Sequence, residues 1–94
     1  MFARTESALA ESVLALSEMA ELLEFLARGL VDEPDAVRVE TEEREDAIVF
    51  HLHVAPDDVG KVIGKQGRIA RALRSVVRAG GARAAERYVL EIAG

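Results

Sequence analysis

The residues whose types and spacing most clearly favour chemistry lie at positions 61–68, in the stretch Lys-Val-Ile-Gly-Lys-Gln-Gly-Arg. Gly64 and Gly67 bracket two polar residues, and because glycine lacks Cβ it lets another backbone approach closely. A glycine turn that opens a helix directs backbone N–H groups outward, and the positive end of the helix dipole adds to their field. Lys65 at the tip and Arg68 at the start of the following helix add two cations. The pattern therefore predicts a site for an anion, most simply a phosphate.

Three phosphate-binding motifs use such glycines. A P-loop requires four residues between its glycines, then Lys and Ser or Thr, but three residues separate Gly60 from Gly64 and Gln66 stands where the hydroxyl would be. A dinucleotide-binding fingerprint requires a preceding strand, whereas the residues before Gly64 have a helical pattern. The third motif is the G-x-x-G loop of KH domains, which clamps about four nucleotides of a nucleic-acid backbone, and residues 63–68 match it. For the glycines alone, an ordinary turn between two helices is the plain alternative.

Length and composition restrict the class of protein. A chain of 94 residues suits one domain with a modest core, and half of its residues are apolar. The absence of cysteine excludes disulfides and thiolate metal sites and fits a reducing compartment. No apolar run approaches the ~20 residues of a membrane span, and the first residues do not have the pattern of a secretion signal. We therefore expect a cytoplasmic protein without a membrane partner.

The two halves of the chain carry opposite charge. Residues 1–60 hold 4 Lys or Arg and 15 Asp or Glu, a net charge of −11, whereas residues 61–94 hold 8 and 2, a net charge of +6. The overall charge of −5 therefore hides a basic segment that begins near the glycines. Such polarity indicates a nucleic-acid binder more clearly than net charge does. The acidic half is expected to repel duplexes and confine a strand to one face.

Two stretches precede the first predicted strand. Residues 1–18 are rich in Ala, Ser and Glu, with a thin apolar face at helical spacing, so we expect an N-terminal extension whose role stays open. Residues 18–31 predict a stronger amphipathic helix that opens the domain proper, residues 19–94. Pro34 prevents that helix from continuing. Its expected apolar face comprises Leu22, Leu23, Phe25, Leu26 and Leu30.

Two strands joined by a polar turn come next. Residues 37–42 alternate Val37, Val39 and Thr41 with charged residues, and residues 48–54 alternate apolar residues with Val49, His51 and His53. Together they predict a hairpin. His51 and His53 lie two residues apart, about 7 Å along one face of the second strand. Because the chain offers no cysteine and no third ligand at suitable spacing, we expect these histidines to face solvent or the sheet and no metal or cofactor to be bound.

The C-terminal third predicts a short helix from Pro56 to the glycines, a longer helix over about 67–80 and a third strand over 88–92. The longer helix is expected to face the core with Ile69, Leu73, Val76 and Val77, and to carry Arg68, Arg71, Arg74 and Arg78 on its other side. No acidic residue stands between positions 61 and 83, so we assign Arg68 and Arg71 to phosphate contacts. The small residues at 79–82 either end this helix or continue it and admit a second helix at close range, and both readings stay open.

The predicted order is helix, strand, strand, helix, G-x-x-G loop, helix and strand, an α+β fold with a three-stranded sheet packed against helices. With residues 59–68 between the central helices, the chain resembles a type II (prokaryotic) KH domain, and more narrowly the small single-domain bacterial RNA-binding proteins of that type. Four further stretches resemble the same family, at 31–37, 54–61, 71–74 and 89–92. The resemblance covers about 19–93, and Gly80 and Gly81 depart from it.

The resemblance implies single-stranded RNA as the partner and a role as an RNA chaperone or post-transcriptional regulator, linked to cell elongation and peptidoglycan homeostasis. It also implies pairing with a larger, Jag-type KH protein or with a second copy of the chain. The glycines are expected to admit the RNA backbone, cationic and amide side chains to donate to it, and two apolar side chains to form a floor for unstacked bases. The residues assigned to RNA binding are Lys61, Val62, Ile63, Gly64, Lys65, Gln66, Gly67, Arg68 and Arg71.

Two other classes of function compete with RNA binding. The first is a protein-interaction module whose main role is KH–KH dimerisation, which the small residues at 79–82 and the apolar N-terminal stretch motivate. The second is an enzyme, which the sequence disfavours because no serine is grouped with histidine and acid and no nucleophilic cysteine exists.

Overall fold

The structure, a computed structural model, describes the backbone of residues 6–94 and the side chains from residue 15 onward. Three helices and three strands follow in the order that the sequence predicts (helix, strand, strand, helix, helix, strand), and the α+β fold class is confirmed. The helices are α1 (Glu6–Arg28), α2 (Val59–Ile63) and α3 (Arg68–Ala84), and the strands are β1 (Arg38–Glu43), β2 (Ile48–His53) and β3 (Tyr88–Ala93). Three single 3-10 turns complete the order, η1 (Pro34–Ala36), η2 (Pro56–Asp58) and η3 (Lys65–Gly67).

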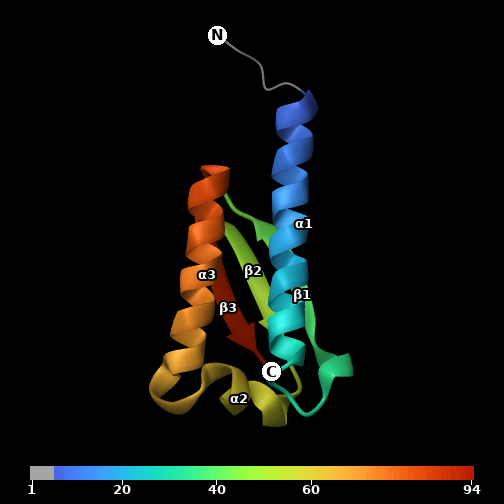
Figure 1. The fold of residues 1–94 in the computed structure, drawn as a ribbon, viewed down its shortest axis with the longest axis vertical. Helices are drawn as coiled ribbons and strands as arrows, with labels where there is room; N and C mark the ends of the chain where they lie inside the picture. The colour runs from blue at the N-terminus through green and yellow to red at the C-terminus, as the bar shows by residue number, and fades with distance from the viewer. Residues whose placement is uncertain (1–5) are drawn as a thin grey trace.

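The three strands form one mixed sheet in the order β1-β2-β3. β1 and β2 are antiparallel, with Arg38 opposite His53, which confirms the predicted hairpin. β2 and β3 are parallel, with Ile48 opposite Tyr88. Because parallel strands cannot be joined by a tight turn, the chain crosses over between them, and α2 and α3 form that crossover. Figure 1 shows α1 and α3 side by side on one face of the sheet, with α2 at one end of the molecule.

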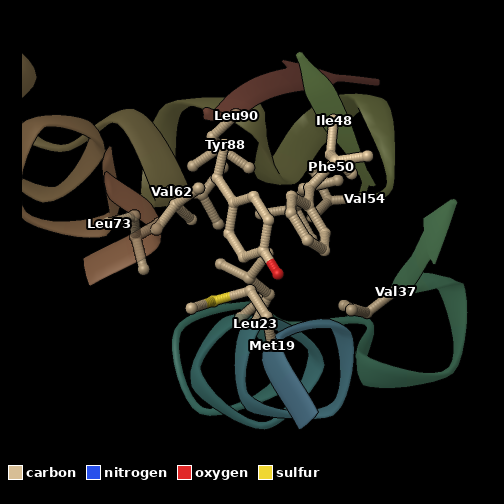
Figure 2. Close-up of a cluster of buried hydrophobic side chains, with 13 residues drawn as sticks. Met19, Leu23, Val37, Ile48, Phe50, Val54, Val62, Leu73, Tyr88 and Leu90 are labelled. Carbon is tan, nitrogen blue, oxygen red and sulfur yellow. The ribbon is translucent and has the colours of Figure 1, made fainter. Parts of the chain in front are cut away.

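The core lies between the sheet and the two long helices (Figure 2). Alternate residues of β2 point into it, as period-two spacing requires, and Phe50 and Leu52 are fully buried there. The rings of Phe50 and Tyr88 meet edge to face with centroids 4.9 Å apart, a favoured aromatic geometry. α1 closes this layer with Met19 and Leu23.

Three residues expected in the core are exposed instead. Leu22 and Phe25 of α1 are 40% and 73% exposed, and Val76 of α3 is 37% exposed. The apolar stripes of both helices are wider than the faces that the sheet covers, so the outermost residues of each stripe remain in solvent. The other residues predicted for these faces are buried or packed against the core.

Residues 6–28 form one helix, which passes without a break through the expected boundary between residues 18 and 19. The division of the chain into an extension and a domain therefore has no counterpart in the backbone, and it stays a prediction. The expected features of residues 1–5 lie outside the described residues.

α3 continues through Gly80 and Gly81, which settles the two readings of that segment. A Cβ on Gly80 would meet the tip of Met19, so the small residue admits α1 of the same chain. A Cβ on Gly81 would lie 2.7 Å from the Glu86 carbonyl oxygen and 3.0 Å from Tyr88 Cβ. The helix ends at Ala85, which has a left-handed conformation (φ 57°). The N–H of Glu86 then donates to the Gly81 carbonyl, as in a Schellman motif.

Candidate nucleic-acid interface

The Gly64–Gly67 turn has a backbone that glycine alone adopts easily. Gly64 has φ 76° and ψ 172°, a region essentially restricted to glycine, and Gly67 has φ 72° in the left-handed region. Gln66 between them is also left-handed, with φ 56°. The turn is closed by a hydrogen bond of 3.1 Å from the Gly67 N–H to the Gly64 carbonyl. Three of its four residues therefore have positive φ, which carries the chain sharply from α2 into α3.

The first turn of α3 is free to meet an anion. No side chain caps its N-terminus, and no acidic residue stands in its first turn. The N–H groups of the first turn and the helix dipole therefore favour negative charge at this end. Lys65, Arg68 and Arg71 are exposed around it, and the Arg68 guanidinium lies 3.4 Å from the Gln66 amide oxygen. The structure thus brings three predicted cations to one end of one helix.

Apolar residues support the turn from below. Val62 is fully buried and belongs to the core. Its side chain can therefore support the neighbouring surface residues but cannot itself contact a base. Ile63 is half-buried beside Gly64, and it is the predicted floor residue that reaches the surface. Ile69, which the sequence placed in the core, is half-buried and lies directly against Gly64. A Cβ on Gly64 would meet three Ile69 atoms at 2.7–2.9 Å.

Lys61 differs from the other predicted cations because it is already paired. Its Nζ lies 3.1 Å from Oδ2 of Asp32 and 3.5 Å from Oδ1 of Asp58. The hydrogen bond and charge of Asp32, with Asp58 behind it, raise the pKa of Lys61 above its ordinary value. Its charge is therefore compensated within the protein, whereas the structure shows no ion pair for Lys65, Arg68 or Arg71 among the described residues.

Comparison with known proteins decides the family. The family model "KhpA/KhpB, KH domain" matches residues 20–92. The chain belongs to the KhpA/KhpB KH-domain family. It is similar to the "RNA-binding protein KhpA" of Clostridium acetobutylicum, with 51% identity over 74 residues that cover 79% of this chain and 99% of that protein. The protein of the same name from Aquifex aeolicus is 49% identical over 77 residues, covering 82% and 98%. That of Treponema pallidum is 50% identical over 72 residues, covering 77% and 90%.

Membership in the KhpA/KhpB family confirms the resemblance and agrees with the prediction of a protein that is not an enzyme. The match begins at residue 20, so residues 6–19 of α1, more than half of that helix, lie outside it. Among the residues described, no helix is both long and apolar enough to cross a membrane.

The two histidines lie on β2, each beside a carboxylate of β1. His51 Nε2 lies 2.8 Å from Glu42, and His53 Nε2 lies 3.0 Å from Glu40. Hydrogen bonds from Arg44 and His51 lower the pKa of Glu42 to about 2. In the part of the chain that is described, no cluster of three His, Cys, Asp or Glu residues could hold a metal. Each histidine instead pairs with a carboxylate on the neighbouring strand.

One residue of the site was missed by the sequence analysis. Asp58 was read as a favourable acid at a helix start, but it is the buried charged residue of the described chain, only 1% exposed. Its carboxylate accepts hydrogen bonds from the N–H groups of Asp32 and Glu33, at 3.3 and 3.0 Å. These partners are 26 and 25 residues away, so no local spacing could have indicated them.

Proposed function

We propose that this protein binds single-stranded RNA without catalysis, and that the Gly64–Gly67 turn clamps the RNA backbone. The observation that carries the proposal is the uncapped, acid-free N-terminus of α3 behind a turn of positive-φ glycines. Such a turn lets a phosphate approach the backbone N–H groups, where the helix dipole favours it. The relatives named RNA-binding proteins support the choice of RNA as the ligand.

The roles of the side chains follow from their positions. Lys65, Arg68 and Arg71 neutralise phosphates, and the Gln66 side-chain amide at the tip donates a hydrogen bond to the RNA backbone. Ile63 offers an apolar surface to an unstacked base, with Val62 holding it from the core side. Residues 59–71, which form the site, contain no aromatic side chain, and Phe50 and Tyr88 pack in the core. Since aromatic stacking contributes little to this site, we expect modest affinity and loose sequence preference.

The test is fluorescence anisotropy of a labelled single-stranded RNA. The variant Lys65→Asp/Gln66→Asp changes the net charge at the turn by −3, and both side chains are exposed, so the fold should survive. Arg83→Gln/Arg87→Asp makes the same change in net charge at the other end of α3, about 25 Å away for a helix of 17 residues. Loss of binding in the first variant alone would support the proposal, whereas equal affinity of both variants would defeat it.

A finer role rests on the family. We propose a cytoplasmic RNA chaperone or post-transcriptional regulator of the KhpA kind, acting in cell elongation and peptidoglycan homeostasis and pairing with KhpB, the larger Jag-type KH protein. Transcript stabilities compared between a deletion strain and one carrying the Lys65→Asp/Gln66→Asp variant test this role. We expect the deletion and the variant to change the stability of the same transcripts by the same amount. A variant strain with wild-type stability for all of these transcripts would contradict the proposal.

A second candidate is an interaction module that acts mainly by KH–KH dimerisation. The observation in its favour is the exposure of Leu22, Phe25 and Val76 on the helices that cover the sheet. Two joined RNA sites would also bind with higher avidity. Sedimentation velocity at micromolar concentration distinguishes the candidates, because a monomer that binds RNA excludes self-dimerisation as the main role. A dimer that Phe25→Asp/Val76→Asp dissociates would support it.

A further inference from the structure

The short helix α2 carries the chain into the G-x-x-G turn. It has five residues, and Val62 is its one buried side chain. The residue before it, Asp58, occupies the N-cap position, where an aspartate usually accepts a hydrogen bond from its own helix. Here the Asp58 side chain makes no such cap. Its carboxylate is directed instead to a different part of the chain.

That part is the link between α1 and β1. The Asp58 carboxylate accepts the N–H groups of Asp32 and Glu33 from this link. Burial alone would raise the pKa of Asp58, but the N–H groups of Glu33 and Asp32 and the ammonium of Lys61 outweigh it and lower the pKa below its ordinary value. Lys61 then bridges Asp58 to the Asp32 carboxylate. Two segments far apart in sequence are therefore joined by hydrogen bonds from backbone N–H groups to the Asp58 carboxylate and by a shared cation.

We propose that Asp58 is a positioning residue for RNA binding, which fixes α2 and the Gly64–Gly67 turn against the α1–β1 link, and that Lys61 serves this tie and does not contact phosphate. The inference rests on the proposed RNA-binding function of the turn. A negative charge beside a phosphate site would ordinarily weaken binding. The structure resolves this conflict, because Asp58 is buried and its charge is shared among two N–H groups and Lys61.

The first test compares Asp58→Asn with Asp57→Asn. Both remove one negative charge next to α2, but Asp57 is exposed and makes no hydrogen bond or ion pair among the described residues. The two N–H groups bond to different oxygens of the Asp58 carboxylate, and an amide keeps only one acceptor oxygen. Asp58→Asn should therefore weaken RNA binding about tenfold, although it makes the protein less acidic. Asp57→Asn should bind as tightly as the wild type or slightly tighter. An Asp58→Asn variant that binds at least as tightly as Asp57→Asn would overturn the inference.

Amide hydrogen exchange tests the tie without RNA. The N–H groups of Gly64 and Gly67 donate to carbonyls within the turn region. In Asp58→Asn they should exchange about tenfold faster relative to the amides of β2, which report global opening. If the exchange rates of the turn amides and of the β2 amides rise by the same factor, Asp58 contributes only to overall stability and the inference fails. Should the wild type bind no RNA, the proposed function fails while this comparison still decides whether the tie exists.

The role of Lys61 is tested separately by the salt dependence of binding. For single-stranded nucleic acid, each neutralised phosphate adds about −0.7 to the slope of log K against log salt concentration. We expect Lys61→Gln to lower affinity with an unchanged slope, and Lys65→Gln to reduce the slope by about 0.7. If Lys61→Gln reduced the slope as much as Lys65→Gln does, Lys61 would contact a phosphate, and the proposed role of Lys61 would be wrong. The Lys61 side chain is 44% exposed, so Lys61→Gln should fold even if Asp58→Asn does not. It then still tests whether Lys61 supports the turn without contacting phosphate.

Discussion

The two glycines of the turn should differ sharply in their tolerance of alanine. At Gly67, nothing lies within 4 Å of an added Cβ, so Gly67→Ala encounters only the left-handed backbone, which costs about 1–2 kcal/mol. At Gly64 the backbone region is open essentially to glycine alone, at about 1–3 kcal/mol. The added Cβ also meets Ile69 atoms at 2.7–2.9 Å, and such overpacking costs a further ~1–3 kcal/mol. We therefore expect Gly64→Ala to lose about 4 kcal/mol of unfolding free energy and Gly67→Ala about 1–2 kcal/mol.

Urea denaturation followed by far-UV circular dichroism measures both values, with an unchanged m-value as the sign that two-state unfolding holds. The steric part can be isolated in an Ile69→Ala background, because two of the three close atoms, Cγ1 and Cδ1, are then absent. There Gly64→Ala should cost about 1–2 kcal/mol less than in the wild type. Equal losses at Gly64 and Gly67, or no relief by Ile69→Ala, would refute the reasoning from backbone conformation and contact.

Three further predictions concern stability. Ala85→Gly should raise the free energy of unfolding by about 0.5–1 kcal/mol in urea titrations, since glycine accepts the left-handed helix cap without strain; a lower value would contradict it. Gly81→Ala should lower the melting temperature more than Gly80→Ala, because backbone obstructs a Cβ at the first site and a flexible side-chain tip at the second. The hydrogen bonds that lower the pKa of Glu42 from 4.5 to about 2 stabilise the folded state. This stabilisation is complete above pH 4.5 and is lost as the pH falls towards about 2, where the carboxylate becomes protonated. Glu42→Gln should therefore flatten the acid limb of the pH–stability curve, and Glu45→Gln should not.

Much of the fold follows from local pattern. Alternation with period two located β1, β2 and β3, and the glycine spacing located the turn and the helix that it opens. The end of α3 could not be predicted from local pattern, because Gly80 and Gly81 resemble a helix C-terminus. Glycine is required there because Met19 and Tyr88 pack against these two positions. Such a requirement depends on which segments meet in space, and helical spacing does not contain that information.

The site shows the same limit. The exposed cations at the start of α3 were predictable, because a stripe of arginine after a glycine turn needs only local sequence. The pairing of Lys61 with Asp32, and the burial of Asp58 between them, join segments more than 20 residues apart. Neither residue type nor spacing distinguishes Asp58 from its exposed neighbour Asp57. The exposure of Phe25 likewise depends on how much of α1 the sheet covers.

The most direct test of the account is the affinity of the wild type and of Lys65→Asp/Gln66→Asp for a single-stranded RNA, measured over a salt series. With Lys65, Arg68 and Arg71 each neutralising one phosphate, the wild type should give a slope of log K against log salt concentration near −2. The folded double variant should show no measurable binding. Binding by the wild type that is insensitive to salt, or undiminished affinity in the double variant, would contradict the claim that the Gly64–Gly67 turn holds the RNA backbone.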